Sequence, residues 1–190
     1  MCSSDLKVGK LGEFGKVVCG KTPSTKNSSF FGGNFPFIKI PDMTQLYVFQ
    51  TESYLTDLGS IELQGKEVPA SSICVSCIAT IGKVAITTED SFTNQQINTI
   101  IPDKKTYLEY LYFTLRNMKE YLEMVGNRGS TTFNINTEMF RNLEIIFPQT
   151  QFLTSFSFVT RNLFEKVLMN SKMIINLQKG KNKLLQELIK

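Results

Sequence analysis

The sequence has no histidine, and its cysteines are few and mostly far apart. Histidine is the commonest general base near neutral pH and the commonest protein ligand for transition metals. Of the 4 cysteines, Cys74 and Cys77 form a CxxC motif, but no second close pair exists to complete a zinc site. These shortages exclude histidine-based catalysis and predict a chain with neither metal nor cofactor.

Long apolar runs are also missing. The longest, residues 70–81, is interrupted by serines and a threonine and is shorter than the roughly 18 residues that span a bilayer. Residues 1–7 lack the basic and apolar blocks of a secretory signal. Both observations predict a cytoplasmic protein without a membrane span.

An excess of positive charge is absent from most of the chain. Residues 1–150 carry 14 Lys and Arg against 15 Asp and Glu, whereas residues 151–190 carry 7 against 2. A strongly basic domain would by itself indicate phosphate binding. Charge therefore gives no evidence for nucleic acid here. The composition, with 42% hydrophobic and 20% charged residues, is typical of a globular protein.

Within the first 148 residues, hydrophobic periodicity predicts short strands mixed with helices. Residues 35–42 alternate in polarity and are bounded by prolines, which is typical of an edge strand. Residues 72–86 are rich in β-branched side chains and predict two short strands around a tight turn. A period of 3.6 predicts a helix over residues 107–126 that packs on the sheet. Further strands are expected at residues 16–19 and 143–147, and a short helix at residues 134–142. The predicted fold class is α+β.

Beyond residue 148 no strand pattern remains, and a single long helix is expected. Its apolar residues recur mostly at spacings of three and four, the pattern of a coiled-coil seam. The predicted seam consists of Phe156, Val159, Leu163, Val167, Asn170, Ile174, Leu177, Leu184 and Leu188. A buried Asn170 would fix the register and number of the paired helices. We therefore divide the chain into a recognition domain, residues 1–148, and a coiled-coil helix, residues 149–190.

A helix of about 38 residues would extend about 57 Å. An apolar stripe on a rod of this length needs another helix to cover it. The alternative is a terminal helix that folds back onto its own domain, as many amphipathic helices do. Gly180 is expected to weaken or bend the helix, because glycine costs about 1 kcal/mol in a helix interior.

Catalytic interpretations find little support in the motifs. The CxxC lies in a strand pattern rather than at a helix N-terminus, so its cysteines are expected to be small buried side chains on opposite faces. Asp42 and Asp103 resemble fragments of a nuclease magnesium site, but Asp103 falls in a predicted turn where charges are simply solvated. The glycine-rich loop and catalytic tetrapeptide of a methyltransferase do not occur.

Three polar loops hold residue types that contact DNA. They lie at residues 21–27, 93–96 and 127–132 and are rich in Lys, Arg, Asn, Gln, Ser and Thr. These side chains read base edges and bind phosphates. They are also ordinary turn residues, so composition alone favours plain surface loops over a DNA interface.

Short blocks occur in a fixed order along most of the chain. They are GKTPS at residues 20–24, FGGNFPFIKIPDM at 31–43, SCIATIGKVAI at 76–86, TNQQ at 93–96, GST at 129–131 and LEIIFP at 143–148. Together they resemble the target recognition domain of type I restriction-modification specificity subunits. LLQEL at residues 184–188 is similar to the end of the long conserved helix of that family.

The resemblance implies a non-catalytic subunit that reads double-stranded DNA in the major groove. Typical members carry two recognition domains and two helices, so this chain resembles half a subunit. The resemblance then implies a homodimer through antiparallel helices that reads two inverted half-sites. It also implies docking of methyltransferase subunits and possible restriction subunits. A 57 Å helix and a rise of 3.4 Å per base pair limit the two domain centres to a separation of about 17 base pairs.

Within this resemblance, loop position and chemistry select the candidate DNA contacts. They are Lys21, Thr22, Ser24, Lys26, Asn27, Lys39, Thr44, Arg128, Ser130 and Thr132. A bidentate contact from Arg128 to guanine would discriminate against the wrong base by about 1–3 kcal/mol. Phe31, Phe35 and Phe37 are expected to serve the core rather than to stack on bases.

Two other functions remain open at this point. In one, the coiled coil is itself the function and the domain only caps it. In the other, the chain mimics a specificity subunit and binds methyltransferase subunits without selecting a DNA sequence. Binding at graded salt separates a DNA reader from the assembly protein, because DNA affinity falls steeply as counterions compete. Capture of methyltransferase subunits without DNA selectivity would favour the mimic.

Overall fold

Five strands form the central sheet of the computed structural model, which describes residues 7–127 and 134–188. In spatial order they are β2 (Gly15–Cys19), β9 (Ile97–Pro102), β6 (Ile73–Ser76), β7 (Val84–Thr87) and β4 (Tyr47–Val48). Neighbours are antiparallel except β4 and β7, which are parallel. The predicted strand pair is confirmed as β6 and β7, but residues 77–83 connect them by a longer loop than the tight turn we expected.

Two smaller sheets flank the central one. One consists of β5 (Ser53–Leu55), β3 (Phe31–Ile38) and β8 (Phe92–Thr93), and the other of β1 (Lys7–Lys10) and β10 (Glu144–Phe147). The prediction of an edge strand at residues 35–42 is wrong, because β3 is the middle strand of its sheet. Pro36 is tolerated there because the pairing with β8 begins only at Phe37. The strand ends at Ile38, and residues 40–42 form a helical turn instead.

Four short helices belong to the domain, and a long one follows them. They are α1 (Asp57–Glu62), α2 (Leu108–Asn117), α3 (Lys119–Gly126), α4 (Thr137–Arg141) and α5 (Thr150–Leu188). The predicted helix over residues 107–126 is therefore two helices that meet at Met118. Leu115 before the break and Leu122 after it are both fully buried. Each half thus keeps its apolar face on the core.

The main core lies between the central sheet and the helices α2, α3 and α5. Alternate residues of β6 point to opposite faces. Ile73 and Val75 belong to the helix-covered core, whereas Cys74 packs with Ile38 and Ala85 on the other face. The sequence therefore predicted the fold class correctly: α+β, with a long C-terminal helix.

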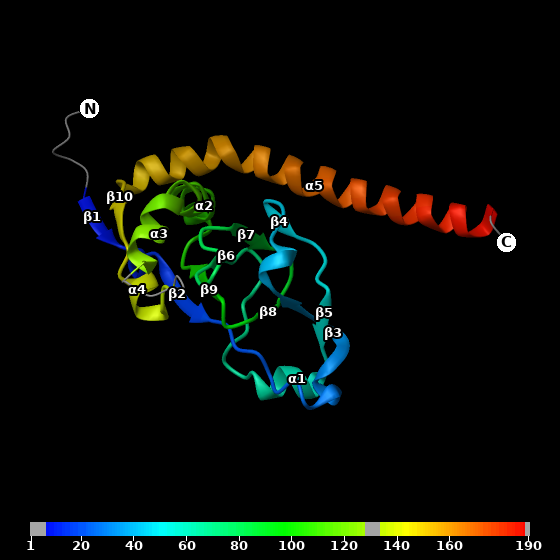
Figure 1. Cartoon of the computed structure of the whole chain (residues 1–190). Coiled ribbons are helices and arrows are strands. Elements are labelled where there is room, and N and C mark those ends of the chain that lie inside the picture. Colours follow the sequence, from blue (N-terminus) through cyan, green and yellow to red (C-terminus); the bar gives the residue numbers. More distant parts are fainter. Residues whose placement is uncertain (1–6, 128–133, 189–190) are drawn as a thin grey trace.

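Helix α5 crosses the domain beside α2 and then continues past it (Figure 1). Its 39 residues span about 58 Å. Every residue from 176 to 188 is exposed. The first part of the helix therefore folds onto its own domain, as the alternative interpretation predicted, and the last part projects. The helix runs through Gly180 without interruption.

Candidate nucleic-acid interface

The first polar loop is bound to the turn between β8 and β9. The N–H of Gly20 donates to the carbonyl oxygen of Ile97 at 3.1 Å, and the N–H of Lys21 donates to that of Thr93 at 3.0 Å. A Cβ on Gly20 would lie 2.2 Å from the carbonyl oxygen of Asn94, so only glycine allows this approach. The hydroxyl of Thr22 donates to the side-chain oxygen of Gln95. Two of the polar loops predicted from sequence are thus neighbours.

Most candidate residues of this loop are exposed. Lys21, Ser24 and Lys26 all have exposed side chains. The ammonium of Lys21 lies 3.9 Å from a carboxylate oxygen of Glu62, with both side chains about half exposed, so this ion pair is weak. The side chain of Asn27 binds its own loop: its oxygen accepts from the backbone N–H of Ser29 at 3.1 Å and from the Ser29 hydroxyl at 2.7 Å.

Lys39 and Thr44 lie in different environments. The ammonium of Lys39 donates to the Ser53 hydroxyl at 2.7 Å, and its side chain is only partly exposed. Thr44 is exposed and lines a shallow groove of about 630 Å³ together with Lys83 and Arg116. Asp42, the first half of the nuclease fragment, caps the backbone: its carboxylate accepts from the N–H groups of Lys39 and Glu52 at 2.7 and 3.0 Å.

The candidates Arg128, Ser130 and Thr132 lie outside the described residues. The N–H of Asn134 donates to the carbonyl oxygen of Gly126 at 3.3 Å, and the N–H of Ile135 donates to that of Cys77 at 2.9 Å. The flanks of the third polar loop are therefore held beside the loop at residues 77–83.

The loop at residues 77–83 links these segments at one end of the central sheet. The N–H of Cys77 donates to the carbonyl oxygen of Gln96 at 2.8 Å. Gly82 has a φ of +82°, and a Cβ there would lie 2.6 Å from Cγ of Lys119. The ammonium of Lys83 reaches the carbonyl oxygen of Ile40 at 3.5 Å. We call the set of loops at residues 20–27, 43–46, 77–83 and 94–96 the loop surface.

Sequence reasoning missed several polar side chains of the loop surface and its border. They are Gln95, Lys83, Arg116 and Lys119. Gln95 was within a predicted polar loop, but only the structure shows that its side chain accepts a hydrogen bond from Thr22 of the first loop. Lys83 lies in the loop before β7 and Arg116 lies on α2, and no sequence signal separates either from ordinary surface charges.

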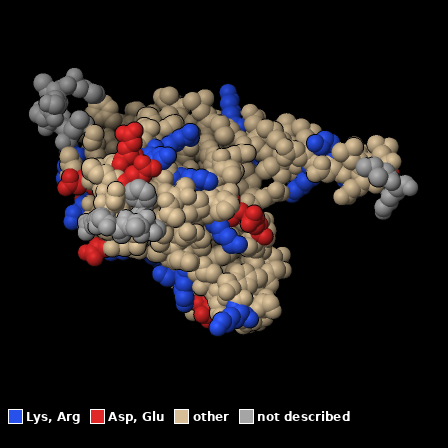
Figure 2. Space-filling model, in the orientation of Figure 1, with Lys and Arg blue, Asp and Glu red and all other residues tan. Residues whose placement is uncertain are grey.

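Positive charge is spread over the domain rather than concentrated. Figure 2 shows Lys and Arg side chains scattered over the visible face, with acidic side chains between them. The far end of α5 carries basic side chains in the same view. The face drawn in Figure 2 therefore shows no concentrated basic patch of the kind that attracts phosphates.

The buried thiols are not reactive groups. Cys74 and Cys77 are 0% and 1% exposed and lie in different core clusters, which confirms that they are buried hydrophobic residues on opposite faces. Burial raises the pKa of Cys74 to about 12 and that of Cys77 to about 11. A thiol with such a pKa is protonated at neutral pH and is not a nucleophile.

Among residues 7–127 and 134–188, no helix is long and apolar enough to cross a membrane.

The predicted seam of α5 is exposed in the structure. Its apolar members are exposed by 38% (Phe156), 67% (Val159), 59% (Leu163), 41% (Val167), 55% (Ile174), 66% (Leu177), 61% (Leu184) and 81% (Leu188), and Asn170 is exposed as well. Phe156 differs from the others because its ring also packs edge-on against Phe113 of α2, 6.1 Å away. The seam therefore follows a face that the domain leaves largely bare.

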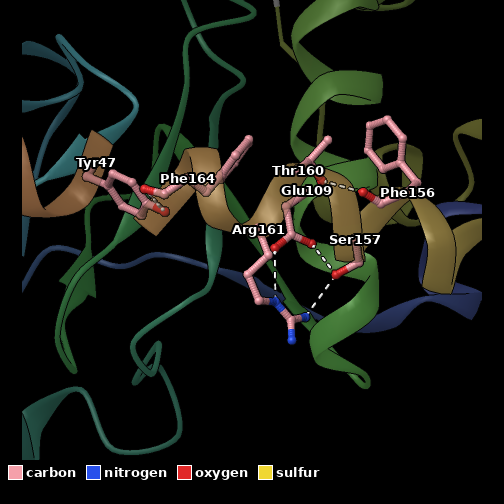
Figure 3. Close-up of polar contacts among 7 residues, drawn as sticks. All are labelled: Tyr47, Glu109, Phe156, Ser157, Thr160, Arg161 and Phe164. Carbon is pink, nitrogen blue, oxygen red and sulfur yellow. Dashed lines mark hydrogen bonds and ion pairs between the residues drawn. The ribbon is translucent and has the colours of Figure 1, made fainter. Parts of the chain in front are cut away.

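A different face of α5 contacts the domain. Leu153, Ser157 and Phe164 are buried, and Leu168 and Ile175 continue this stripe as partly buried residues. The ring of Phe164 packs edge-on against Tyr112 and Phe113 at 5.6 Å. The carbonyl oxygen of Phe164 accepts from the Tyr47 hydroxyl at 3.5 Å (Figure 3). Four seam positions, Phe156, Leu163, Val167 and Ile174, each precede a domain-facing residue by one position, so the seam is rotated from the domain-facing stripe by about 100°.

A family model for the type I restriction modification DNA specificity domain matches residues 3–155. The chain belongs to this family. Residues of the chain are 45% identical over 164 positions to the type I restriction enzyme HindI specificity subunit of Haemophilus influenzae. They are 32% identical over 152 positions to the MjaIX specificity subunit of Methanocaldococcus jannaschii. These matches cover 85% and 77% of the chain but only 36% and 35% of the relatives. The chain therefore spans about a third of their length.

Solved structures of the family share the fold. The HsdS subunit from Thermoanaerobacter tengcongensis superposes with a TM-score of 0.65 at 14% identity, over 91% of this chain and 41% of that one. The type I S subunit from M. genitalium superposes with a TM-score of 0.62 at 15% identity, over 90% and 42%. The arrangement of sheets and long helix is thus that of the specificity domain family.

Proposed function

We propose that this chain reads one half of a bipartite DNA site for a type I restriction-modification system and catalyses no reaction itself. Two copies pair through antiparallel α5 helices. Methyltransferase subunits dock on the pair, and restriction subunits join the same assembly. The family match supports this proposal, as do relatives that are named specificity subunits.

One observation carries the proposal: the two stripes of α5 end at different places. The last apolar residue of the domain-facing stripe is Ile175, and the next positions of the stripe, Gln178 and Asn182, are polar. The seam stays apolar through Leu184 and Leu188, beyond the reach of the domain. An exposed apolar stripe on a helix of this length is normally covered by another helix.

A second copy of the chain is the partner that suits the seam best. The seam runs along α5 from Phe156 to Leu188. In an antiparallel pair, the start of each seam therefore packs against the end of the other, and both seams are buried along their whole length. Such a pair is closed by a two-fold axis and leaves no seam open. The same axis places two loop surfaces in inverted orientation, which matches two inverted half-sites with an unread spacer.

The loop surface supplies the chemistry for reading DNA. Lys21, Lys26 and Thr44 are exposed there, and Gln95 presents an amide beside Thr22. Side chains of these types bind phosphates and base edges in the major groove. With the base contacts proposed for Arg128, Ser130 and Thr132, each copy reads a few base pairs.

Charge in the seam tests the pairing. The variant with Leu177→Asp and Leu184→Asp places two carboxylates at seam positions, so it is expected to sediment as a monomer at concentrations where the wild type is a dimer. The matched control carries Gln178→Asp and Asn182→Asp, which add the same charge to exposed polar positions of the same segment. The control is expected to remain dimeric. A wild type that is monomeric at all concentrations contradicts the proposed pairing.

Selection from random duplexes tests DNA reading. The wild type should enrich two inverted motifs at a fixed spacing, with an affinity that falls as salt rises. Arg128→Ala should relax the preference at one base position. Dimers that enrich no motif indicate an assembly protein, and binding of methyltransferase subunits without DNA selection indicates a mimic.

A further inference from the structure

Three polar side chains join α5 to the domain (Figure 3). The Ser157 hydroxyl donates to Oε2 of Glu109 at 3.0 Å, and Nη2 of Arg161 donates to the Ser157 hydroxyl at 2.9 Å. Nε of Arg161 lies 3.5 Å from Oε1 of Glu109. Glu109 belongs to α2, whereas Ser157 and Arg161 are one turn apart on α5. We call these three residues the clamp.

The clamp is mostly withdrawn from water. The side chain of Glu109 is 3% exposed and Ser157 is 1% exposed, while the side chain of Arg161 is 41% exposed. A buried ion pair is not an efficient source of stability, since desolvation offsets much of the attraction between the charges. Its hydrogen bonds have one favourable geometry, however. Polar groups of this kind can specify a single register between helices.

The apolar contacts beside the clamp do not specify a register as strongly. The domain-facing stripe of α5 repeats apolar residues about once per turn, and packed helices can shift past each other by one turn, about 5.4 Å. A shift by one turn would move either Leu153 or Arg161 into the place of Ser157. The buried carboxylate of Glu109 would then lose its hydroxyl partner. The clamp therefore penalises the shifted registers.

We infer that the clamp positions α5 on the recognition domain and so sets the spacer length that a pair of copies accepts. This inference rests on the proposed function. A shift of 5.4 Å corresponds to about 1.6 base pairs for one copy and about 3 for the pair. Glu109, Ser157 and Arg161 are positioning residues that need no contact with DNA.

A spacer series on DNA gives the first test. The two half-sites are placed on duplexes whose spacers differ by single base pairs, and binding is measured for each. The wild type should show one optimum, with at least tenfold weaker binding two base pairs away. The variant with Glu109→Leu, Ser157→Ala and Arg161→Leu leaves no clamp group unpaired, and its affinity should stay within threefold across about three base pairs. Its affinity for a single half-site should be unchanged.

Two further variants separate positioning from general destabilisation. Glu109→Gln keeps an oxygen that accepts from Ser157 and should keep a single optimum. The control with Glu165→Gln and Lys166→Gln removes an acid and a base from exposed positions of α5 and should behave as the wild type. A folded triple variant with a sharp, unchanged optimum overturns the inference.

A distance measurement tests the clamp without DNA. Spin labels at Gln64 in the domain and Gln178 on α5, both exposed, are introduced after Cys2 and Cys19 are replaced by serine. Labelled protein is diluted into an excess of unlabelled protein, so that only distances within one copy are measured. The wild type should then give one narrow distance distribution, and the triple variant a broader one with a population displaced by about 5 Å. Identical narrow distributions overturn the inference. If the distances change as expected but no protein selects a bipartite site, the proposed function fails and the clamp stands.

Discussion

Helix α5 consists of two segments that both carry apolar residues at helical spacing but have different surroundings. The proximal segment, residues 150–175, buries Leu153 and Phe164 against the domain. The distal segment, residues 176–188, leaves all its side chains exposed. An apolar repeat therefore predicts that a helix stripe is buried, but it does not identify the surface that buries it. The partner is found by asking where each stripe becomes polar.

The largest contrast between the segments is expected from truncating one apolar residue in each. Phe164→Ala removes a ring that is 6% exposed and should lower the free energy of unfolding by about 3–5 kcal/mol. Leu177→Ala removes a side chain that is 66% exposed and should change the stability of the monomer by less than about 0.5 kcal/mol. Urea denaturation at a concentration below that of self-association measures both. Equal losses would show that the distal stripe packs on its own domain.

Removing the buried carboxylate should have the next largest effect. Glu109→Ala leaves Ser157 and Arg161 without their acceptor, and the expected loss is about 2 kcal/mol, because Arg161 remains partly solvated. The loss should appear in the domain and in the proximal segment together. The measurement is denaturation followed by circular dichroism. An unchanged midpoint would mean that the clamp contributes nothing to holding the helix.

Alkaline pH should weaken the domain and leave the distal segment unaffected. Burial raises the pKa of Cys74 from 9.0 to about 12 and that of Cys77 from 9.0 to about 11. Both thiols therefore stay protonated in the folded state while those of the unfolded chain ionise above pH 9, so stability is lost between pH 9 and about 11. The loss at pH 10 is about 1 kcal/mol for each thiol. Denaturation at pH 8 and pH 10 measures it, and a Cys74→Ala, Cys77→Ala variant should lose most of this dependence.

Gly180 offers a change that should act only on the distal segment. Its Cα has no neighbour near the position of a Cβ, so Gly180→Ala should stabilise the local helix by up to about 1 kcal/mol. Amide hydrogen exchange around residue 180 should slow accordingly, while the proximal segment stays unchanged. Faster exchange near residue 180 would contradict this expectation. It would mean that the added methyl group collides with an atom outside the single chain.

The sequence carried the local signals of the fold and little of its long-range pairing. β-branched runs predicted β6 and β7, and apolar residues at spacings of three and four predicted α5, because both are patterns of neighbouring residues. The pairing of β1 with β10 joins strands more than 130 residues apart, and no local pattern predicts it. Pro36 favoured an edge strand, but its neighbour β8 pairs with only the last two residues of β3.

The candidate site was predicted in kind rather than in detail. Lys21, Ser24, Lys26 and Thr44 remain predicted contacts on an exposed surface. The side chains of Asn27 and Lys39 bind neighbours within the domain, which residue type alone does not reveal. Arg116 of α2 and Lys83 of the loop at residues 77–83 became candidates only because the fold brings both beside Thr44.

Hydrogen exchange along α5 at several protein concentrations tests most directly whether a second copy covers the seam. The account predicts strong protection of residues 153–168 at every concentration. It also predicts that protection of residues 176–188 rises with concentration as the pair forms. Protection of both segments that is equal and independent of concentration would contradict the account.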